Sequence, residues 1–547
     1  MYADPQPFLD AIAKEQRPPA TGLRVTGISV PHHLLAIDLI ARGFQAAADN
    51  LYDRVIVMSP DHFNRSRRPM ATTQRDFDNV FGQVQNDHVA TGTLVKSKDL
   101  FDNLPSFDDE HGIQALIPFI SYFFPAAKVV PIAISYSATV EECDCALSLI
   151  EALAGPSTLI IQSTDYSHYL PPDVALQRDQ ETLNVIAAND VGTLLRLLQP
   201  AHMDSKASQY LQMQLQSRVY KSSGTVIANR NSAEYSAIGR KTTSYIVTAY
   251  TQRPLAGVEL RYSDQQVFYF GGDTFIGRWL TAPLVDKNVA ALVIDSVMAI
   301  TGGAPLIVNL EGVVLDEPPE GARNDLHIMH ASLAIPILKA MNVRVVGLAS
   351  NHSYDLGLSG FEESRSTLKQ AGIVPLAHKQ IVDVGPFRLL GLNFIGKCDF
   401  HNYPVMRDND LEELCHMQAK PPLLAFVHWG REYTNAAQAG EYAAARAIWA
   451  GGVSAIIGAH SHQATDHIEA MQGGEYAMTF SLGNLLFDQT SSRGSGALLE
   501  VRVFEQGTYA MRLIPIPNLF EVCTGQLQVE QGSVKSPETS SACSTVS

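Results

Sequence analysis

The sequence has few cysteines and few tryptophans, and this scarcity excludes one class of fold. There are 6 cysteines and 3 tryptophans in 547 residues, and no two cysteines are spaced C-x-x-C. Disulfide-stabilised domains are much richer in cysteine, and zinc or redox motifs use that spacing. The sequence therefore predicts free thiols in a reducing compartment.

Basic residues are also fewer than acidic residues. The chain has 40 Lys and Arg against 56 Asp and Glu, so its formal net charge is −16. Nucleic-acid binding needs a basic face that neutralises phosphates. We therefore expect no nucleic acid among the partners.

Long uninterrupted apolar segments are missing as well. The most apolar window, residues 116–135, contains three prolines and Lys128. It is more typical of a buried helix followed by a buried strand than of a membrane span. The first residues include acidic side chains and no apolar stretch of a signal peptide. These patterns predict a cytoplasmic protein without a membrane span.

What is present is a globular α/β composition, 46% hydrophobic and 18% charged, long enough for two to four domains. In the first half, apolar strand-like runs alternate with amphipathic helical segments, which favours an α/β domain with a mainly parallel sheet. The expected strands are 23–30, 54–59, 128–134 and 157–162. The expected helices are 34–49, 112–124, 140–153 and 179–199.

A Pro- and Gly-containing break separates this pattern from a second half with more strand character. The expected strands there are 305–309, 343–348, 387–395, 422–427, 454–457, 477–481 and 497–503. From 525 the chain is polar and rich in Ser and Thr, which is typical of disorder. We predict domains at 1–255 and 263–524, a linker at 256–262 and a disordered tail at 525–547.

Residues with the chemistry of metal ligands follow many strands of the second half. They are Asp273, Asn309, Glu311, Asn351, His352, Asp355, His428, His460 and His462. Singly, such a residue is more often a helix cap or a loop residue. Together, carboxylates and imidazoles at strand ends form a donor set for divalent cations. Because alternate residues leaving a strand point the same way, we expect His460 and His462 to face one site.

The order Asp, acidic residue, Asn-His, His and G-x-H-x-H resembles the calcineurin-like metallophosphoesterase fold, an α/β/β/α sandwich. Within it, "NLEG", "NHSYDLG", "VHWGREY", "GAHSH" and "SLGNLLFD" resemble the CapA-type (poly-γ-glutamate capsule biosynthesis) family. The resemblance assigns one metal position to Glu311, Asn351, His428 and His460, and another to Asp273, Glu311 and His462. It assigns catalytic roles to His352 and Asp355. The fold's usual D-x-H motif is absent, because Thr274 and Phe275 follow Asp273.

This resemblance implies a hydrolase with a divalent metal, Mn, Zn or Fe. Metal-activated water would attack a phosphoryl or acyl centre, and His352 would act as the acid. The implied substrates are phosphoesters, small γ-glutamyl amides or a γ-glutamyl polymer.

A second set of histidines and carboxylates lies in the first half. It comprises His32, His33, Asp61, His62, Glu110, His111, Asp165 and His168, mostly after predicted strands. Three interpretations stay open: hydrogen-bonded loop residues, a mononuclear metal site of two His and a carboxylate, or an acid/base pocket.

The elements "PH", "SPDH", "EH" and "S-D-x-x-H" in residues 20–250 resemble the Memo-like family (AmmeMemoRadiSam system protein B), related in fold to LigB-type dioxygenases. The resemblance implies an α/β/α domain in which His32 and His62 bind iron or copper, and Asp165 and His168 are catalytic. His33 is an alternative to His32. The family's third ligand is often a cysteine, where this chain has Ile238; Glu234 is a candidate substitute.

Three functions therefore stay open. The first is a metal-dependent hydrolase with a Memo-like accessory domain. The second is a non-heme iron or copper oxidoreductase seated in the Memo-like domain. The third is a non-catalytic binding module for a radical-SAM partner, which the family name implies.

Overall fold

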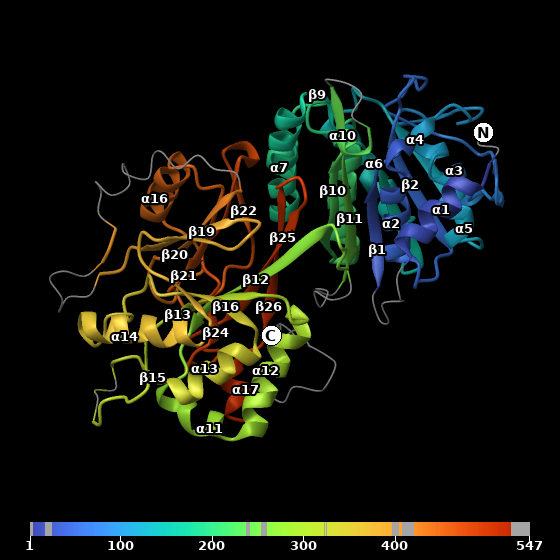
Figure 1. Cartoon of the computed structure of the whole chain (residues 1–547). Helices are drawn as coiled ribbons and strands as arrows, with labels where there is room; N and C mark the ends of the chain where they lie inside the picture. Colours follow the sequence, from blue (N-terminus) through green and yellow to red (C-terminus); the bar gives the residue numbers. More distant parts are fainter. Residues whose placement is uncertain are drawn as a thin grey trace, which may run out of the picture.

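The protein is described by a computed structural model covering residues 4–16, 24–236, 241–252, 260–321, 323, 325–396, 404–406 and 421–526. Figure 1 shows two α/β bodies, the first coloured blue to green and the second yellow-green to red. Among the described residues, no helix combines the length and the apolarity needed to cross a lipid bilayer.

The first body is built on a nine-stranded sheet with the order β10-β11-β1-β8-β2-β7-β3-β6, and β9 pairs with β11. Its centre, β1, β8, β2 and β7, is parallel, as the alternation of strands and helices predicted. The strands are β1 Val25–Val30, β2 Arg54–Pro60, β3 Met70–Thr72, β6 Phe101–Asn103, β7 Lys128–Ile134, β8 Thr158–Ser163, β9 Tyr166–Leu170, β10 Ser223–Asn231 and β11 Thr242–Thr251. A small hairpin, β4 Phe77–Asn79 and β5 Gly82–Val84, lies apart.

Helices cover both faces of this sheet. Alternate residues of β2 divide between two buried clusters, Val55 and Val57 in one and Ile56 and Met58 in the other. The first cluster contains side chains of α1 Gln6–Glu15, α2 Ile37–Ala47 and α5 Ile117–Phe123. The second contains side chains of α6 Val140–Glu151, α7 Pro172–Ala188, α8 Val191–Leu194 and α9 Lys206–Leu215. The domain is thus an α/β/α sandwich.

Prolines shift two helices from the expected ranges. The segment 112–124 forms α4 His111–Gln114 and then α5, because Pro118 fits the first turn of a new helix but not a helix interior. The segment 179–199 is divided between α7, which begins earlier, at Pro172, and ends at Ala188, and the short helix α8; Asn189, between them, is in the left-handed conformation. The short helices α3 His88–Leu94 and α10 Ser232–Tyr235 complete the domain.

The second body contains two larger sheets. One has the order β17-β16-β13-β12-β25-β26, with β24 beside β12, and the other has the order β18-β19-β20-β21-β23-β22. The first sheet comprises β12 Gln265–Thr274, β13 Leu306–Leu310, β16 Val343–Gly347, β17 Val374–Leu376, β24 Asn484–Leu486, β25 Gly496–Phe504 and β26 Tyr509–Ile516. The second comprises β18 Ile381–Asp383, β19 Arg388–Asn393, β20 Leu423–His428, β21 Ala455–Ala459, β22 Glu469–Met471 and β23 Tyr476–Thr479. The pair β14 Val313–Leu315 and β15 Ile328–His330 is separate.

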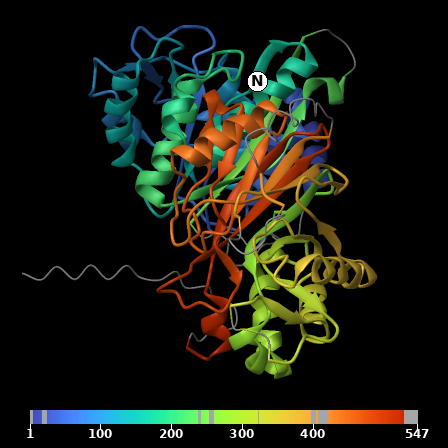
Figure 2. The same cartoon turned by 90° about the vertical axis from the view of Figure 1, so that its left-hand side faces the viewer.

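These sheets pack face to face between helices. Phe270 of the first sheet and Phe426 of the second lie in one buried cluster, with ring centroids 5.8 Å apart. Outside the first sheet lie α11 Thr281–Val285, α12 Lys287–Thr301, α13 Ala331–Ala340, α14 Gly357–Gln370 and α17 Leu519–Cys523. Outside the second lies α16 Ala439–Ala450. This is the expected α/β/β/α sandwich, and Figure 2 shows its layers from a second side.

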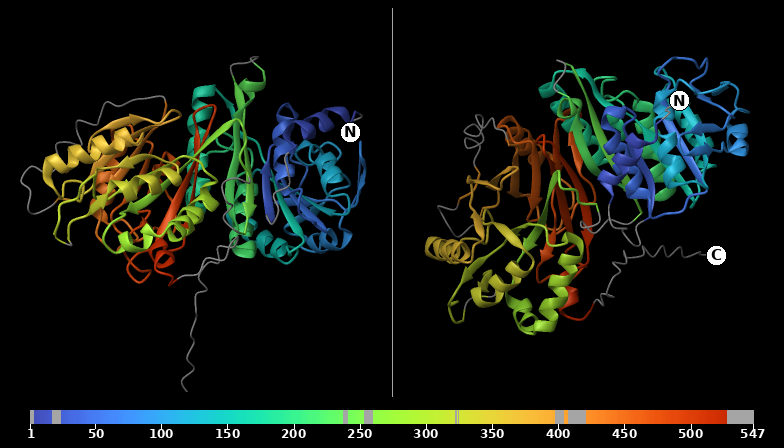
Figure 3. Two further views of the ribbon diagram at one scale, coloured as in Figure 1. Left: turned by 60° about the horizontal axis from the view of Figure 1, so that its bottom comes forward. Right: turned by 45° about the vertical axis from the view of Figure 1, so that its right-hand side comes forward.

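The bodies meet where α7 packs against β26 (Figures 1 and 3). The Gln180 amide donates to the carbonyl of Tyr509 and accepts from its N–H, each at 2.9 Å. The Asn184 amide donates to the Gly474 carbonyl at 2.8 Å. The expected domain limits stay predictions. The expected linker lies mostly, and the expected tail almost entirely, outside the described residues.

Candidate metal centres at the strand ends

The predicted ligands of the second body come together where parallel strands end. Asp273 belongs to the end of β12, Glu311 follows β13, His428 ends β20, and His460 follows β21; all four are buried. The approach of β12 to its neighbour requires glycine, because a Cβ at Gly272 would lie 1.9 Å from the Gly483 carbonyl oxygen. The strand ends therefore converge on one buried point.

Glu311 lies at the centre of this arrangement. Three groups of possible ligand atoms include its carboxylate, and the atoms of each group lie within 4.8 Å of one another. The groups are Glu311 with His428 and His460, Glu311 with Asp273 and His462, and Glu311 with His327 and His352. The Oε2 atom of Glu311 is buried and has no hydrogen-bond partner among the described residues. An unpartnered carboxylate oxygen among imidazoles would be available to hold a divalent cation.

The first group consists of three of the four residues that the family resemblance assigned to one metal position. His428 Nε2 lies 2.8 Å from Asn351 Oδ1, and the His428 ring centroid lies 4.5 Å from that of His460. His460 Nδ1 is buried without a hydrogen-bond partner in the described part of the chain. An imidazole nitrogen, an amide oxygen and a carboxylate oxygen thus face one another. Their role as ligands stays a prediction.

The second group is organised by Asp273. Its Oδ1 accepts a hydrogen bond from Asn309 Nδ2 at 2.7 Å, and both its oxygens lie 3.1 Å from the backbone N–H of His460. Its Oδ2 lies 3.2 Å from His462 Nδ1, which is also 2.9 Å from Asn484 Oδ1. Asp273 therefore holds both the β21 loop and the imidazole of His462.

The expectation that His460 and His462 face one site is met, but strand alternation is not the reason. Strand β21 ends at Ala459. The two histidines have φ of 91° and 61°, the left-handed region that residues other than glycine seldom adopt. Such strain persists only where surrounding contacts hold it, and it gathers at functional sites. The loop conformation, not a strand, directs both rings toward Glu311.

Burial and neighbouring charges give these side chains unequal proton affinities. Burial, reinforced by the charge of Asp273, raises the pKa of Glu311 well above its usual range. Burial and nearby histidines hold the pKa of His428 well below its usual range. Burial lowers the pKa of His460 to about 4 despite the neighbouring Asp273. For His462, burial is outweighed by Asp273 and Glu311, which raise the pKa to about 9. The lowered pKa values leave the imidazoles of His428 and His460 neutral near pH 7, which is the form that binds a metal.

The candidate acid His352 is oriented by Asp355. His352 Nδ1 lies 2.8 Å from Asp355 Oδ2, which also accepts the backbone N–H of His327 at 2.6 Å. The other ring nitrogen, Nε2, lies 3.9 Å from Glu311 Oε1. Because Asp355 holds Nδ1, the Nε2 atom of His352 is directed toward the cluster around Glu311.

His327 was missed by the sequence reasoning. Its ring stacks on that of His352, with centroids 3.5 Å apart, and on Phe275, at 4.6 Å. It precedes the short strand β15, whereas the sequence pattern that predicted the other ligands was a polar residue after a strand. That pattern therefore does not single out His327. Phe275, at the position of the absent D-x-H histidine, is a buried core residue that packs against this stack.

The first body contains a second cluster at the strand ends. His32 follows β1, His62 follows β2 and Asp165 follows β8. The atoms of two ligand groups lie within 4.8 Å of one another, His32 with His62 and His111, and His32 with Asp165 and Asp204. Asp204 was not predicted, because it precedes helix α9 instead of following a strand.

Neighbouring groups orient the two main imidazoles. His32 Nδ1 lies 3.1 Å from Ser163 Oγ, and His62 Nδ1 lies 2.5 Å from Glu110 Oε1. Their Nε2 atoms lie 3.2 and 3.9 Å from Asp204 Oδ2. A carboxylate behind a histidine is the usual support of a metal-binding imidazole.

The alternatives named from the sequence occupy other positions. His33 is exposed, and its Nδ1 lies 2.7 Å from the Tyr245 hydroxyl, so His32 is the histidine of the cluster. The Glu234 carboxylate accepts the Asn231 N–H at 2.6 Å as a helix cap, and it belongs to neither ligand group. Ile238 lies outside the described residues.

The remaining candidates lie at the margin of the cluster. The Nδ1 atom of His168 is buried and has no hydrogen-bond partner within the described ranges. Burial lowers its pKa, although Asp204 and Asp165 act in the opposite direction. Asp61 accepts the backbone N–H of Ser66 at 2.9 Å and so stabilises a loop. In the centre, burial lowers the pKa of His32 but Asp165 and Asp204 outweigh it and raise the pKa to about 9.

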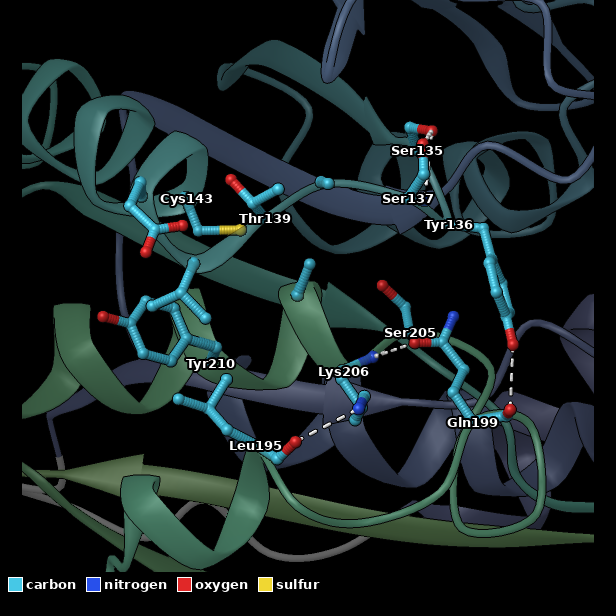
Figure 4. A pocket seen from close by; sticks show the side chains of 14 residues that line it. Ser135, Tyr136, Ser137, Thr139, Cys143, Leu195, Gln199, Ser205, Lys206 and Tyr210 are labelled. Atoms are coloured by element: carbon cyan, nitrogen blue, oxygen red, sulfur yellow. Dashed lines mark hydrogen bonds between the residues drawn. The ribbon is translucent and has the colours of Figure 1, made fainter.

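A cavity of about 410 Å³ opens on the surface of the first body (Figure 4). It lies between the end of β7 and the starts of α6 and α9. Its lining includes Tyr136, Cys143, Gln199, Ser205 and Lys206. Ser205 and Lys206 directly follow Asp204 in the chain, so the segment before α9 contributes to both the cavity and the cluster.

Comparisons with known proteins agree with this division. A model described as Memo-like protein matches residues 4–249, and one described as bacterial capsule synthesis protein PGA_cap matches 267–377 and 407–489. The protein is thus a two-domain α/β chain. It is a fusion of a Memo-like domain and a CapA-type PGA_cap domain.

Individual relatives are distant. A MEMO1 family protein of Caldivirga maquilingensis is 27% identical over 174 residues, 30% of this chain and 61% of the relative. The PGA biosynthesis protein CapA of Bacillus subtilis is 26% identical over 271 residues, 45% of this chain and 70% of the relative. The chain spans less than two thirds of the length of the first MEMO1 family relatives. A hypothetical protein from Thermus thermophilus has 16% identity and a TM-score of 0.29, and the match covers 46% of this chain and 100% of that one.

Proposed function

We propose that the CapA-type domain is a metal-dependent hydrolase that cleaves a phosphoester or a γ-glutamyl amide. The observation that carries the proposal is the buried Glu311 carboxylate, which has an unpartnered oxygen in the described structure and belongs to three ligand groups. The similarity to the Bacillus relative, a PGA biosynthesis protein, supports including γ-glutamyl compounds among the substrates.

The residues present fit a divalent cation, Mn, Zn or Fe. One position would be held by Glu311, Asn351, His428 and His460, and a second by Asp273, Glu311 and His462. The cation would supply Lewis acidity that polarises the substrate and an attacking water. The unpartnered atoms Glu311 Oε2 and His460 Nδ1, counted over the described residues, are free to be its ligands.

The chain's own acid is His352. Asp355 holds its Nδ1, so Nε2 is the atom that delivers a proton to the leaving oxygen or nitrogen. The stacked ring of His327 limits the rotation of His352. The role of Asp355 is to position this imidazole.

Metal analysis combined with a hydrolysis assay tests the proposal. The full chain would be loaded with Mn, Zn or Fe and assayed on bis-p-nitrophenyl phosphate and on γ-glutamyl p-nitroanilide. We expect Glu311→Gln and His428→Ala to lose metal and activity together. The matched control is His467→Ala, because His467 is exposed and forms an ion pair with Asp466 in the described part of the chain. Wild-type hydrolysis by Glu311→Gln would refute the proposal.

A second candidate function rests on the His32 and His62 cluster, which favours a non-heme iron or copper oxidoreductase in the Memo-like domain. Iron lost in His32→Ala and His62→Ala but kept in His428→Ala would support it. If no metal binds to any preparation, a third interpretation gains support, a binding module for a radical-SAM partner. We also propose that the protein is cytoplasmic. We propose further that the first domain ends at residue 255 and the second begins at residue 263.

A further inference from the structure

We infer that Asp204 completes a metal centre in the Memo-like domain together with His32 and His62. A carboxylate would then act where the Memo resemblance implies a cysteine. The inference goes beyond the proposed hydrolase and does not depend on it. The donor set would be two imidazoles and one carboxylate.

The first support is the geometry of the three donors. Asp204 Oδ2 lies 3.2 Å from His32 Nε2 and 3.9 Å from His62 Nε2. Ligand atoms about 2.0–2.2 Å from one ion are about 3–4 Å apart, so these separations suit a common ion. The opposite nitrogens of the two imidazoles face Ser163 and Glu110, which leaves both Nε2 atoms directed at Asp204.

The second support is an unpartnered oxygen. Asp204 Oδ1 is buried and makes no hydrogen bond to any described residue, while the side chain as a whole is only 10% exposed. Burying a carboxylate oxygen without a partner is costly. A ligated cation would remove that cost.

The third support is that the Asp204 backbone is held in place. Its N–H donates to the Asp165 carbonyl at 3.0 Å, and its carbonyl accepts from Gln199 Nε2 at 2.5 Å. The Asp165 N–H donates in turn to Asp204 Oδ2 at 3.2 Å. The carboxylate is therefore preorganised, as a ligand must be if binding is to cost little entropy.

The charge of the pocket also calls for a cation. Glu110, Asp165 and Asp204 surround the two imidazoles, and no lysine or arginine of the described residues forms an ion pair with Asp165 or Asp204. An oxygen donor in place of a thiolate disfavours Cu(I). Two histidines and one carboxylate are the ligand set of non-heme Fe(II) sites. We therefore assign a hard or borderline divalent ion, Fe(II) or Mn(II).

Cobalt titration of the metal-free full chain tests this assignment, because Co(II) reports its ligands by visible absorption. All variants would be made in a Glu311→Gln parent, so that the second body contributes little to Co(II) binding. The Co(II) binding of each variant is compared with that of this parent, and the comparison holds whether or not Glu311→Gln has itself removed metal. We expect Asp204→Asn and His62→Ala to weaken Co(II) binding at least about tenfold, the loss that even outer-shell partners cause. Asp190→Asn, which keeps its helix-capping oxygen, is the control.

Asp204→Asn that binds Co(II) as tightly as the parent, while His62→Ala does not, would overturn the role of Asp204. Unchanged binding in both variants would overturn the centre itself. If Asp204→Asn does not fold, Asp204→Cys keeps the test open. A thiolate-to-cobalt charge-transfer band in that variant supports ligation at position 204, and its absence in the folded, cobalt-loaded protein contradicts it.

Discussion

At the scale of single residues, both domains orient an imidazole in the same way. In one, Glu110 faces His62 Nδ1; in the other, Asp355 faces His352 Nδ1. Each carboxylate fixes the ring and leaves Nε2 for chemistry. The partner of that Nε2 then determines the role, which we propose to be a metal for His62 and a leaving group for His352.

A general acid at His352 predicts a dependence on the leaving group. We expect His352→Gln to lower kcat about 10²- to 10⁴-fold for esters of poorly acidic alcohols. The loss should be much smaller for p-nitrophenyl esters, because nitrophenolate leaves without a proton. Comparison of phenyl and p-nitrophenyl substrates in steady-state kinetics measures this difference. Equal losses for both substrates would exclude the role, and His330→Gln, at an exposed histidine, serves as control.

At the scale of elements, a buried ion cluster ties three strands of the first sheet of the CapA-type domain together. The Glu500 carboxylate of β25 contacts Arg502 Nε at 2.6 Å, Arg512 of β26 at 2.8 Å and the Tyr269 hydroxyl of β12 at 2.6 Å. Burial acts to raise the pKa of Glu500, but Arg502 and Arg512 outweigh it and lower the pKa to about 2. The charged form is thus the one the fold stabilises.

This cluster predicts a pH-dependent stability. Because the folded pKa of Glu500 lies below its unfolded value, its contribution is full above about pH 4.5 and is lost as the pH falls toward 2. Glu500→Gln should cost roughly 3–5 kcal/mol at pH 7, since two arginines lose their charged partner. The cost should shrink at pH 3.5. Urea unfolding followed by tryptophan fluorescence at both pH values measures it, with the exposed Glu317→Gln as control. A pH-independent difference would contradict the prediction.

At the scale of the whole molecule, α7 of one domain docks on β26 of the other. Gln180 satisfies both backbone groups of Tyr509, which is 1% exposed, and Phe504 belongs to a buried cluster shared with the Memo-like domain. All three tryptophans, Trp279, Trp429 and Trp449, lie in the CapA-type domain. Tryptophan fluorescence therefore reports one domain, while far-ultraviolet circular dichroism reports both.

The docking predicts coupled unfolding of the domains. We expect the fluorescence and dichroism transitions to coincide in the wild type and to separate in Gln180→Ala. The substitution leaves the N–H and C=O of Tyr509 unpaired, at about 1–3 kcal/mol each. Gln177→Ala, one turn earlier on the exposed side of α7, should leave the transitions together. Separate transitions in the wild type would show that the domains are not coupled.

Chelation predicts a change in the same measurement. A cation that binds only the folded state at 100 times its Kd adds about 2.7 kcal/mol to the free energy of unfolding. Removing metal should therefore lower the fluorescence-detected Tm of the wild type. The shift should be smaller in Glu311→Gln, which can lose only the metal of the Memo-like domain. An equal shift in both proteins would place the bound metal elsewhere.

The sequence by itself determined the two α/β domains and most of their strands. Apolar runs that end in polar residues mark buried parallel strands, and the ends of such strands meet at one sheet edge. For that reason the sequence alone singled out Asp273, Glu311, His428 and His460, which lie close together in the structure; their role as metal ligands stays a prediction. The lack of disulfide motifs and of long apolar runs was likewise visible in the sequence alone.

Only the tertiary structure brought in His327 and Asp204, and it alone placed His32 instead of His33 in the cluster. His327 precedes a strand and Asp204 precedes a helix, so no local pattern distinguishes them from ordinary polar residues. Their chemistry comes from contacts with residues far away in the chain, and such contacts are set by packing. The left-handed φ of His460 and His462 has the same origin, because long-range contacts, not local preference, stabilise it.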